Sequence, residues 1–277
     1  MLRVFILTIF PEIVKNFLNL SIIKRAIKKG VLSVEVVNIR EFSKDKHKKV
    51  DDYIYGNKKG MLFSFKPLYF ALEYIKSKSK SSYVILPSPR GRILDNFLIN
   101  DLSKLKEITF ICPNYEGVDE RILRFINEEI SIGDYIISSG ELAVFVILES
   151  ILRKKTIKYD SYSNDSFSLF KLPFLLENPQ YTRPSKIINP LNRNIYLNVP
   201  NYLTHGNHKE ILKNNLKSSI SQTIYKKPSL FLKLYNYLSL KKNGRRVIYT
   251  KNFFNFISNK ELDDILYEAI LDNVIPS

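Results

Sequence analysis

The stretch YEGVDERILRFINEEISIGDYIISSGE, Tyr115 to Glu141, decides the fold of this 277-residue chain. It holds three of the nine glycines in the sequence: Gly117, Gly133 and Gly140. Glycine has no Cβ atom, so its backbone can approach a ligand or another segment closely. Glycine is rare in the rest of the chain, so residues 115–141 are unusually rich in positions with a permissive backbone. We therefore expect this stretch to form part of a binding site.

Short apolar segments alternate with amphipathic ones on both sides of this stretch. LRVFILTIF, LSVEVVNI, SSYVILP, EITFIC and DYIIS are typical of strands, whereas PEIVKNFLNLSIIKRAIKKG, PLYFALEYIKSKSK and GELAVFVILESILRKK are typical of helices. This alternation predicts a parallel sheet with helices on both faces. Six of the nine glycines lie between residues 56 and 140, nearly all at the ends of the expected strands, where parallel sheets bind their ligands.

The character of the chain changes after residue 154. Residues 154–168 are polar and show no apolar period, which is typical of a linker. Beyond them no convincing strand is found, and HKEILKNNLKSSISQTIYKK, PSLFLKLYNYLSL and NKELDDILYEAIL predict helices. We expect an α/β domain over residues 1–160, a flexible linker over 161–175 and a small all-helical domain over 176–277.

The positive charge is concentrated in the C-terminal part. The chain carries a net charge of +16, and residues 181–260 contain fifteen Lys or Arg residues against a single acid, Glu210. This imbalance favours an anionic partner such as nucleic acid. The alternative is a lysine-rich composition spread over ordinary solvated surfaces.

Several other classes of protein receive no support. The only cysteine is Cys112, so the chain cannot form an internal disulfide, and we expect a reducing compartment. The N-terminus is typical of a buried strand and not of a signal peptide, and no apolar run is long enough to span a bilayer. Neither GxGxxG nor GxxxxGK[ST] occurs. His205 and His208 have a ligand-like spacing, but a helix start with Asn207 as N-cap and Glu210 three residues later is the favoured interpretation.

Seven motifs occur in one characteristic order: DDYIYGNKKGM, LPSPRGRILD, YEGVDERI, SIGDYIISSGEL, DSF, NPQYTRP and GNHKEI. Together they resemble bacterial tRNA (guanine-N1)-methyltransferase, which modifies guanine at tRNA position 37 and belongs to the knotted (SPOUT) methyltransferase superfamily. The resemblance covers residues 1–223. It implies a deep trefoil knot in the N-terminal domain, a homodimer with a shared active site, and tRNA bound by the basic domain. With the single cysteine and the short apolar runs, we expect a cytoplasmic protein that does not bind a membrane.

The resemblance also implies the cofactor and its site. S-adenosylmethionine would lie among three knot loops, with residues 132–137 forming the adenine pocket through main-chain hydrogen bonds. The cofactor-binding residues would be Leu86, Pro87, Ser88, Pro89, Pro113, Tyr115, Glu116, Gly117, Ile132, Gly133, Asp134, Tyr135, Ile136, Ile137, Ser139 and Gly140.

Two catalytic residues follow from the same resemblance. Asp165 in the DSF motif would be the general base, contributed by the partner subunit, and Arg153 would support catalysis. The chemistry fits these residue types. N1 of guanine must lose a proton before it becomes a good nucleophile, and a guanidinium near O6 would stabilise the resulting negative charge. Nothing in these residues specifies a metal site.

The chain departs from the family pattern at several positions. Asn57, Pro113 and Ser139 stand where glycines are usual, Asn114 replaces an arginine and Pro87 replaces a leucine. Proline cannot donate a backbone N–H to a cofactor. Two further hypotheses therefore stay open: a tRNA-binding homologue with weakened catalysis, and a knotted methyltransferase with another RNA target.

Overall fold

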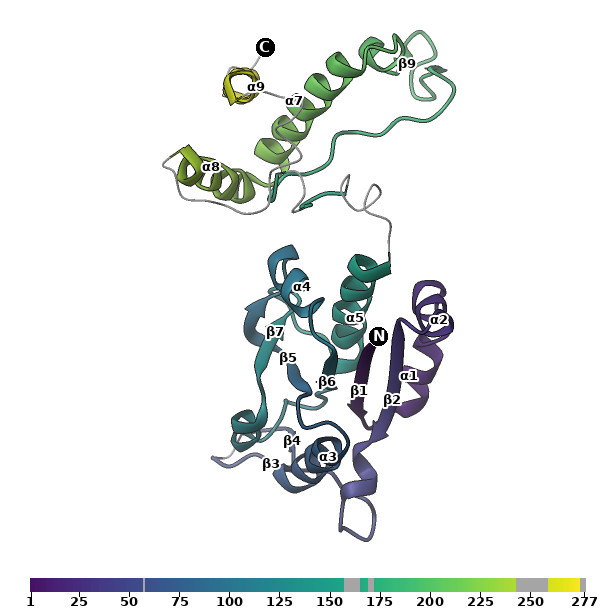
Figure 1. Cartoon of the computed structure of the whole chain (residues 1–277), viewed down its shortest axis with the longest axis vertical. Helices are drawn as coiled ribbons and strands as arrows, with labels where there is room; N and C mark the ends of the chain where they lie inside the picture. Colours follow the sequence, from purple (N-terminus) through teal and green to yellow (C-terminus); the bar gives the residue numbers. More distant parts are fainter. Residues whose placement is uncertain (57, 157–164, 169–171, 243–258, 275–277) are drawn as a thin grey trace. The chain divides into compact units, whose positions relative to one another are not determined.

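The computed structural model describes residues 1–56, 58–156, 165–168, 172–242 and 259–274 (Figure 1). The chain forms two compact units, Met1–Ile157 and Lys158–Ser277. Within the described ranges, no helix combines the length and the apolar character that crossing a membrane requires.

The first unit is built on a five-stranded parallel sheet, as the sequence predicts. Its strand order is β2 (Leu32–Asn38), β1 (Leu2–Thr8), β6 (Glu107–Ile111), β5 (Tyr83–Ile93) and β7 (Glu128–Ser131). All four neighbouring pairs are parallel. Parallel strands need crossover connections, and helices supply most of them here. The carboxyl ends of β5, β6 and β7 consequently lie side by side.

Helices cover both faces of this sheet (Figure 1). Leu2, Val4 and Ile6 of β1 are buried on one face, in a core with residues of α1 (Pro11–Phe17), α2 (Ser21–Lys28), α4 (Asn96–Leu102) and α5 (Gly140–Thr156). Phe5 and Leu7 face the other side, against α3 (Phe65–Lys78), η1 (Ile39–Phe42) and η2 (Glu120–Phe125). Successive side chains of a strand point to opposite faces of the sheet, so β1 contributes side chains to both cores.

Two sequence predictions for this unit are wrong in detail. The single helix expected over residues 11–30 is two helices, because Leu20 adopts an extended conformation with ψ of 149°. A strand is predicted at residues 134–138, but the strand here is β7, which precedes them. Gly133, with φ of +149°, turns the chain out of the sheet, and the side chain of Ile136 is 78% exposed.

One hairpin was not expected from the sequence. β3 (Asp51–Tyr53) pairs in antiparallel fashion with β4 (Met61–Phe63). The backbone N–H of Phe63 donates to the carbonyl of Gly117 at 2.9 Å, and that of Glu116 donates to Met61 at 3.0 Å. These bonds attach the hairpin to the loop that follows β6. Asn57, one of the departures from the family pattern, lies outside the described residues.

The second unit contains the three expected helices, α7 (His208–Lys226), α8 (Pro228–Lys242) and α9 (Asn259–Val274), and the short η3 (Asn201–Leu203). Its described residues also include a two-stranded antiparallel sheet, β8 (Lys186–Ile188) with β9 (Tyr196–Asn198), so the all-helical prediction is wrong. Three-residue strands are too short to produce a readable alternation. The predicted cap of α7 is confirmed: the Asn207 side chain accepts from the backbone N–H of Glu210 at 3.3 Å.

The structure describes only part of the predicted linker, residues 161–175. The C-terminal end of this segment is buried, which is not typical of a linker. Leu172 is 1% exposed and Leu175 is 9% exposed. Both pack with Leu216 and Ile220 of α7, Leu234 of α8 and residues of α9. Residues 172 to 175 therefore belong to the core of the second unit. The polar composition of the preceding residues concealed this boundary.

Candidate active site

A cavity of about 640 Å³ lies at the carboxyl ends of β5, β6 and β7. A volume of this size suits a small organic ligand. Fourteen of the sixteen predicted cofactor-binding residues line it: Leu86, Pro87, Ser88, Pro89, Pro113, Tyr115, Glu116, Gly117, Ile132, Gly133, Tyr135, Ile136, Ile137 and Gly140. The structure thus brings together three loops that are up to 54 residues apart in the sequence. Asp134 and Ser139 are not among the lining residues.

Close backbone contacts hold these loops together. The Gly140 N–H donates to the carbonyl of Pro113 at 2.8 Å, and a Cβ atom at position 140 would lie 2.4 Å from that oxygen. A Cβ atom on Gly133 would meet the ring of Tyr135 at 2.4 Å. The clustered glycines therefore allow segments to pack more closely than other residues permit.

Part of the cavity wall was missed from the sequence. Ile54, Lys58, Lys59 and Leu62 of the β3–β4 hairpin line it, and so does Arg90. The remaining unpredicted lining residues are Asn114, Val118, Glu120, Glu129, Ile130, Ser131, Ser138 and Ala143. The glycine-rich motifs around residues 56–60 and 91 marked these loops, but only the sheet order shows that they meet.

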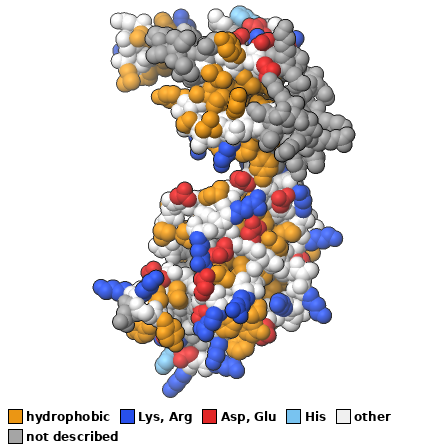
Figure 2. Space-filling model, turned by 90° about the vertical axis from the view of Figure 1, so that its left-hand side faces the viewer, with side chains coloured by type: hydrophobic (Ala, Val, Ile, Leu, Met, Phe, Trp, Pro, Cys, Tyr) orange, Lys and Arg blue, Asp and Glu red, His pale blue; other side chains and the backbone are white. Residues whose placement is uncertain are grey.

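Charged groups of both signs surround the cavity. Arg90 forms ion pairs with Glu120 at 2.8 Å and Glu129 at 3.2 Å. Lys58 and Lys59 are exposed, and neither forms an ion pair with a residue that the structure describes. Across the face of the first unit drawn in Figure 2, Lys and Arg side chains are likewise interspersed with Asp and Glu. Among the described residues, the hairpin side of the cavity is therefore the side that offers unpaired positive charge.

A buried carboxylate lies directly behind the cavity wall. Glu141, the second residue of α5, is fully buried. It accepts hydrogen bonds from the Thr8 hydroxyl at 2.5 Å, from the Ser139 hydroxyl at 2.6 Å and from the Asn114 amide at 3.4 Å. Asn114 and Ser139, two departures from the family pattern, thus meet at one carboxylate.

Two titratable side chains near this wall have raised pKa values. Burial raises the pKa of the Tyr115 phenol, and the Asp51 carboxylate adds to the effect. Burial raises the pKa of the Cys112 thiol well above its usual value, and the negative charge of Glu141 contributes. Cys112 is fully buried, so the thiol stays protonated and unreactive.

The two predicted catalytic residues lie outside this cavity lining. Arg153 is exposed in the last turn of α5. It follows Gly140 by thirteen residues, which places it roughly 20 Å farther along the helix axis at 1.5 Å per residue. Asp165 is half-buried in the second unit, where its carbonyl accepts from the Ser168 N–H at 3.3 Å. Their catalytic roles stay predictions.

Fold and cavity together define a class: a parallel α/β protein whose loops enclose a cavity of small-ligand size at the carboxyl edge of the sheet. The family described as tRNA (Guanine-1)-methyltransferase TrmD matches residues 2–233. The chain belongs to this family of methyl-transferring enzymes, as the sequence motifs indicated.

Named relatives agree with this membership. The chain is 44% identical over 240 residues to a tRNA (guanine-N(1)-)-methyltransferase of Buchnera aphidicola, covering 83% of this chain and 94% of the relative. It is 40% identical over 239 residues to that of Fervidobacterium nodosum, covering 84% and 91%. The crystal structure of tRNA (m1G37) methyltransferase from Aquifex aeolicus superposes with a TM-score of 0.62 at 35% identity, covering 82% of this chain and 93% of that one.

Proposed function

We propose that this protein transfers a methyl group from S-adenosylmethionine to N1 of guanine 37 in tRNA, in the cytoplasm. The observation that carries the proposal is the convergence of three loops on one cavity, in a chain of the tRNA (guanine-1)-methyltransferase family. The cavity provides the methyl-donor site, and the basic C-terminal part provides affinity for RNA.

The residues present fit S-adenosylmethionine. The cavity has apolar walls, such as Leu86 and Ile132, and polar residues, such as Ser88 and Ser138, and five of the six residues 132–137 line it. In this proposal the main chain of those residues binds the adenine. When bound, S-adenosylmethionine supplies an electrophilic methyl group on a positively charged sulfur. Pro113 lines the cavity without a backbone N–H, so the loop after β6 holds the ligand through its other groups.

The base and the stabilising cation come from Asp165 and Arg153. The Asp165 carboxylate accepts the N1 proton of guanine, a contribution of roughly 10²–10⁴-fold to the rate. The Arg153 guanidinium stabilises the charge that develops at O6. Arg153 is roughly 20 Å along α5 from the cavity-lining end of the helix, which supports a site that two subunits complete. We therefore propose a homodimer in which the partner subunit's Asp165 serves each cavity.

A trefoil knot belongs to the same proposal. The chain leaves β6 at Ile111 and returns from β7 through residues 132–139, and Gly140 then bonds back to Pro113. Family membership and this close crossing of segments support a knot in the first unit. Knots are rare, because most chains do not thread through their own loops.

Residues 176–277 form the tRNA-binding domain in this proposal. Fifteen Lys or Arg residues between 181 and 260 attract phosphates, and tyrosines such as Tyr196 offer stacking surfaces for bases. The ammonium of Lys186 lies 3.7 Å from the centre of the Tyr196 ring, so a positive charge and an aromatic face adjoin on the β8–β9 hairpin.

Replacing Asp165 tests the proposal most directly. Asp165→Ala is expected to abolish methylation of a tRNA transcript with guanine at position 37, while calorimetry shows unchanged S-adenosylmethionine binding. Full activity of Asp165→Ala would show that Asp165 is not the general base. The shared site has its own test, in mixed dimers of Asp165→Ala with the cavity variant Gly140→Val. A random mixture is expected to recover about a quarter of wild-type activity, since half the dimers are mixed and each has one intact site.

A second candidate is a tRNA-binding homologue with weakened turnover, which the presence of Pro113 in the cavity wall favours. Titration of the wild-type protein with millimolar S-adenosylmethionine separates the two candidates, because the binding protein gives no heat. A different RNA target is a further alternative, and mapping the methylated nucleotide by mass spectrometry identifies it.

A further inference from the structure

Glu141 is a buried carboxylate for which the proposed mechanism has no use. Its side chain is fully buried, and among the residues that the structure describes no Lys, Arg or His forms an ion pair with it. Its hydrogen-bond donors are the neutral groups of Thr8, Asn114 and Ser139. Removing a charge from water is costly, so a buried carboxylate with only neutral partners requires an explanation.

The groups around the Glu141 carboxylate are neutral. Three side chains donate hydrogen bonds to it, and it lies in the first turn of α5. None of these groups carries a full positive charge. The ionised side chain therefore retains its net negative charge, and the surrounding protein screens it much less than water would.

This charge lies within reach of the cavity. Gly140, its chain neighbour, lines the cavity, and so does Asn114, which contacts both carboxylate oxygens at 3.4 Å. Adjacent Cα atoms are about 3.8 Å apart, so the carboxylate lies on the order of 10 Å or less from the ligand volume. The other acids at the cavity differ. Glu120 and Glu129 are paired with Arg90, and Glu116 is exposed to water.

We infer that Glu141 is a positioning residue whose negative charge makes the cavity prefer the cationic methyl donor over the neutral product. The inference rests on the proposed function. Methyl transfer breaks an S–CH₃ bond and forms an N1–CH₃ bond, the N1 proton passes to the base, and the sulfonium becomes an uncharged thioether. A fixed negative charge behind the wall attracts the ligand before transfer and loses this attraction afterwards, which favours release of S-adenosylhomocysteine.

The test compares two ligands that differ by one methyl group and one charge. Glu141→Gln keeps the size and polarity of the side chain and removes its charge. Calorimetry with the purified full chain is expected to show S-adenosylmethionine binding weakened on the order of tenfold, and S-adenosylhomocysteine binding changed less than twofold, since a unit charge about 10 Å away at an effective dielectric of about 20 has that effect. An equal loss for both ligands would mean that Glu141 only clamps the loops, and would overturn the inference. No change for either ligand would overturn it too.

Two further variants keep the inference testable if Glu141→Gln folds poorly. Asn114→Arg leaves Glu141 in place and adds a cation beside it, so the preference for the methyl donor is expected to fall. Ser139→Ala removes one donor and keeps the charge, so the ratio of the two affinities is expected to stay as in the wild type. If Ser139→Ala lowered the ratio of the two affinities and Asn114→Arg left it unchanged, the electrostatic role of Glu141 would be refuted.

The outcomes also separate this inference from the proposed function. If the wild-type protein binds both ligands and methylates tRNA, and the affinity ratio is insensitive to the charge at position 141, only the inference fails. If the wild-type protein binds neither ligand, both fail.

Discussion

The backbone N–H of Gly140, the first residue of α5, donates to the carbonyl oxygen of Pro113, which follows β6, at 2.8 Å. This bond joins the loop after β7 to the loop after β6 at the wall of the cavity. A Cβ atom at position 140 would lie 2.4 Å from the same oxygen, a distance that real Cβ atoms essentially never show. Glycine at this position is therefore a requirement of the packing between two loops.

Gly140→Ala is expected to separate these two loops. The added methyl group cannot be accommodated without moving backbone, and overpacking of this kind costs about 1–3 kcal/mol of stability. Because both displaced loops line the cavity, S-adenosylmethionine affinity is expected to fall at least tenfold, as measured by calorimetry on protein shown to be folded by circular dichroism.

Gly30→Ala is the matched control. Gly30 has a φ of +65° with nothing within 4 Å of the added Cβ atom, so the substitution introduces backbone strain of about 1–2 kcal/mol without a clash. It should lower the melting temperature and leave ligand affinity unchanged. Similar affinity losses in both variants would show that general destabilisation, and not the packing of the two loops, controls binding.

Lys58 and Lys59 are expected to bind phosphates of the RNA substrate. Both line the cavity from the β3–β4 hairpin and form no ion pair with a described residue. The double substitution Lys58→Gln/Lys59→Gln should raise the KM for tRNA several-fold. It should also reduce the slope of log affinity against log salt by about 0.7–0.9 for each phosphate that the lysines no longer neutralise. The affinity for S-adenosylmethionine should change less than twofold.

The control for this pair is Lys28→Gln/Lys29→Gln. These lysines are exposed at the end of α2, and their substitution makes the same change in net charge, but they do not line the cavity. Equal effects of the two double variants on tRNA binding would indicate that only net charge matters and would contradict a specific role of the hairpin.

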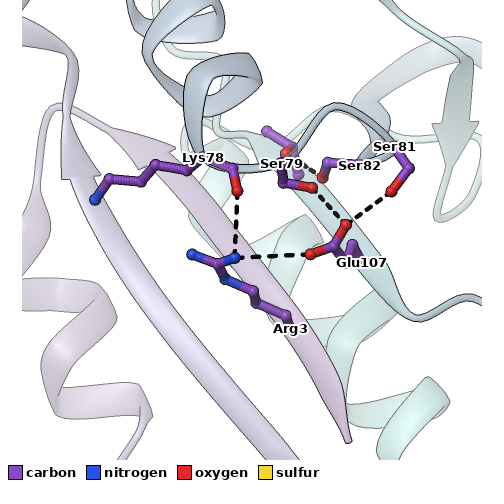
Figure 3. A network of polar contacts seen from close by, with 7 residues as sticks. Arg3, Lys78, Ser79, Ser81, Ser82 and Glu107 are labelled. Carbon is purple, nitrogen blue, oxygen red and sulfur yellow. Dashed lines mark hydrogen bonds and ion pairs between the residues drawn. The ribbon is translucent and has the colours of Figure 1, made fainter.

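Glu107 is expected to contribute stability that depends on pH. Figure 3 shows its carboxylate accepting hydrogen bonds from Ser79 at 2.5 Å and Ser81 at 2.9 Å, with Arg3 at 3.7 Å. The Ser79 bond, then the Ser81 bond and the charge of Arg3, hold the pKa of Glu107 below its usual value. A lowered pKa in the folded state means that this stability is present above the unfolded pKa of about 4.3 and is lost as the pH falls through the folded value.

Glu107→Gln should therefore lower the free energy of unfolding by about 1 kcal/mol at neutral pH, with the difference from wild type disappearing in acid. Urea titrations between pH 3 and pH 7 measure this. Glu12→Gln, which removes an exposed partner of Lys15, should stay within about 0.5 kcal/mol of wild type throughout. A difference for Glu107→Gln that persists in acid would exclude the charge as its origin.

Leu172 tests where the second unit begins. Its side chain is 1% exposed and packs with Leu216 and Leu234. Leu172→Ala should destabilise the second unit by about 2–5 kcal/mol, because it removes buried methyl groups and leaves a cavity. Leu191→Ala is the control, since Leu191 is 96% exposed and its truncation should cost less than about 0.5 kcal/mol. Proteolysis and chemical unfolding would report the difference. If Leu172→Ala and Leu191→Ala both changed stability by similarly small amounts, residues 172 to 175 would belong to the linker and not to the core of the second unit.

The sequence predicted much of this architecture, because several elements carry their own signal. Strands such as β1 and β6 are short runs buried on both faces, and α3 and α5 have a helical apolar pattern. The ordered motifs indicated the family and fourteen of the residues that line the cavity. Among the elements that were missed, β3, β4, β8 and β9 have three residues each, too few for a period to be read, and α4 is a short helix of seven residues.

By itself the sequence determined most of the longer helices and strands, the family and the loops that concentrate glycine, since periodicity, motif order and backbone permissiveness are properties of residues near one another in the chain. Only the tertiary structure decided which of these loops meet. The pairing of β5 with β7, the lysines of the β3–β4 hairpin at the cavity, and the hydrogen bonds of Thr8, Asn114 and Ser139 to Glu141 all join distant residues. Such interactions form only once burial of the two cores has fixed the order of the strands, and no local pattern encodes them.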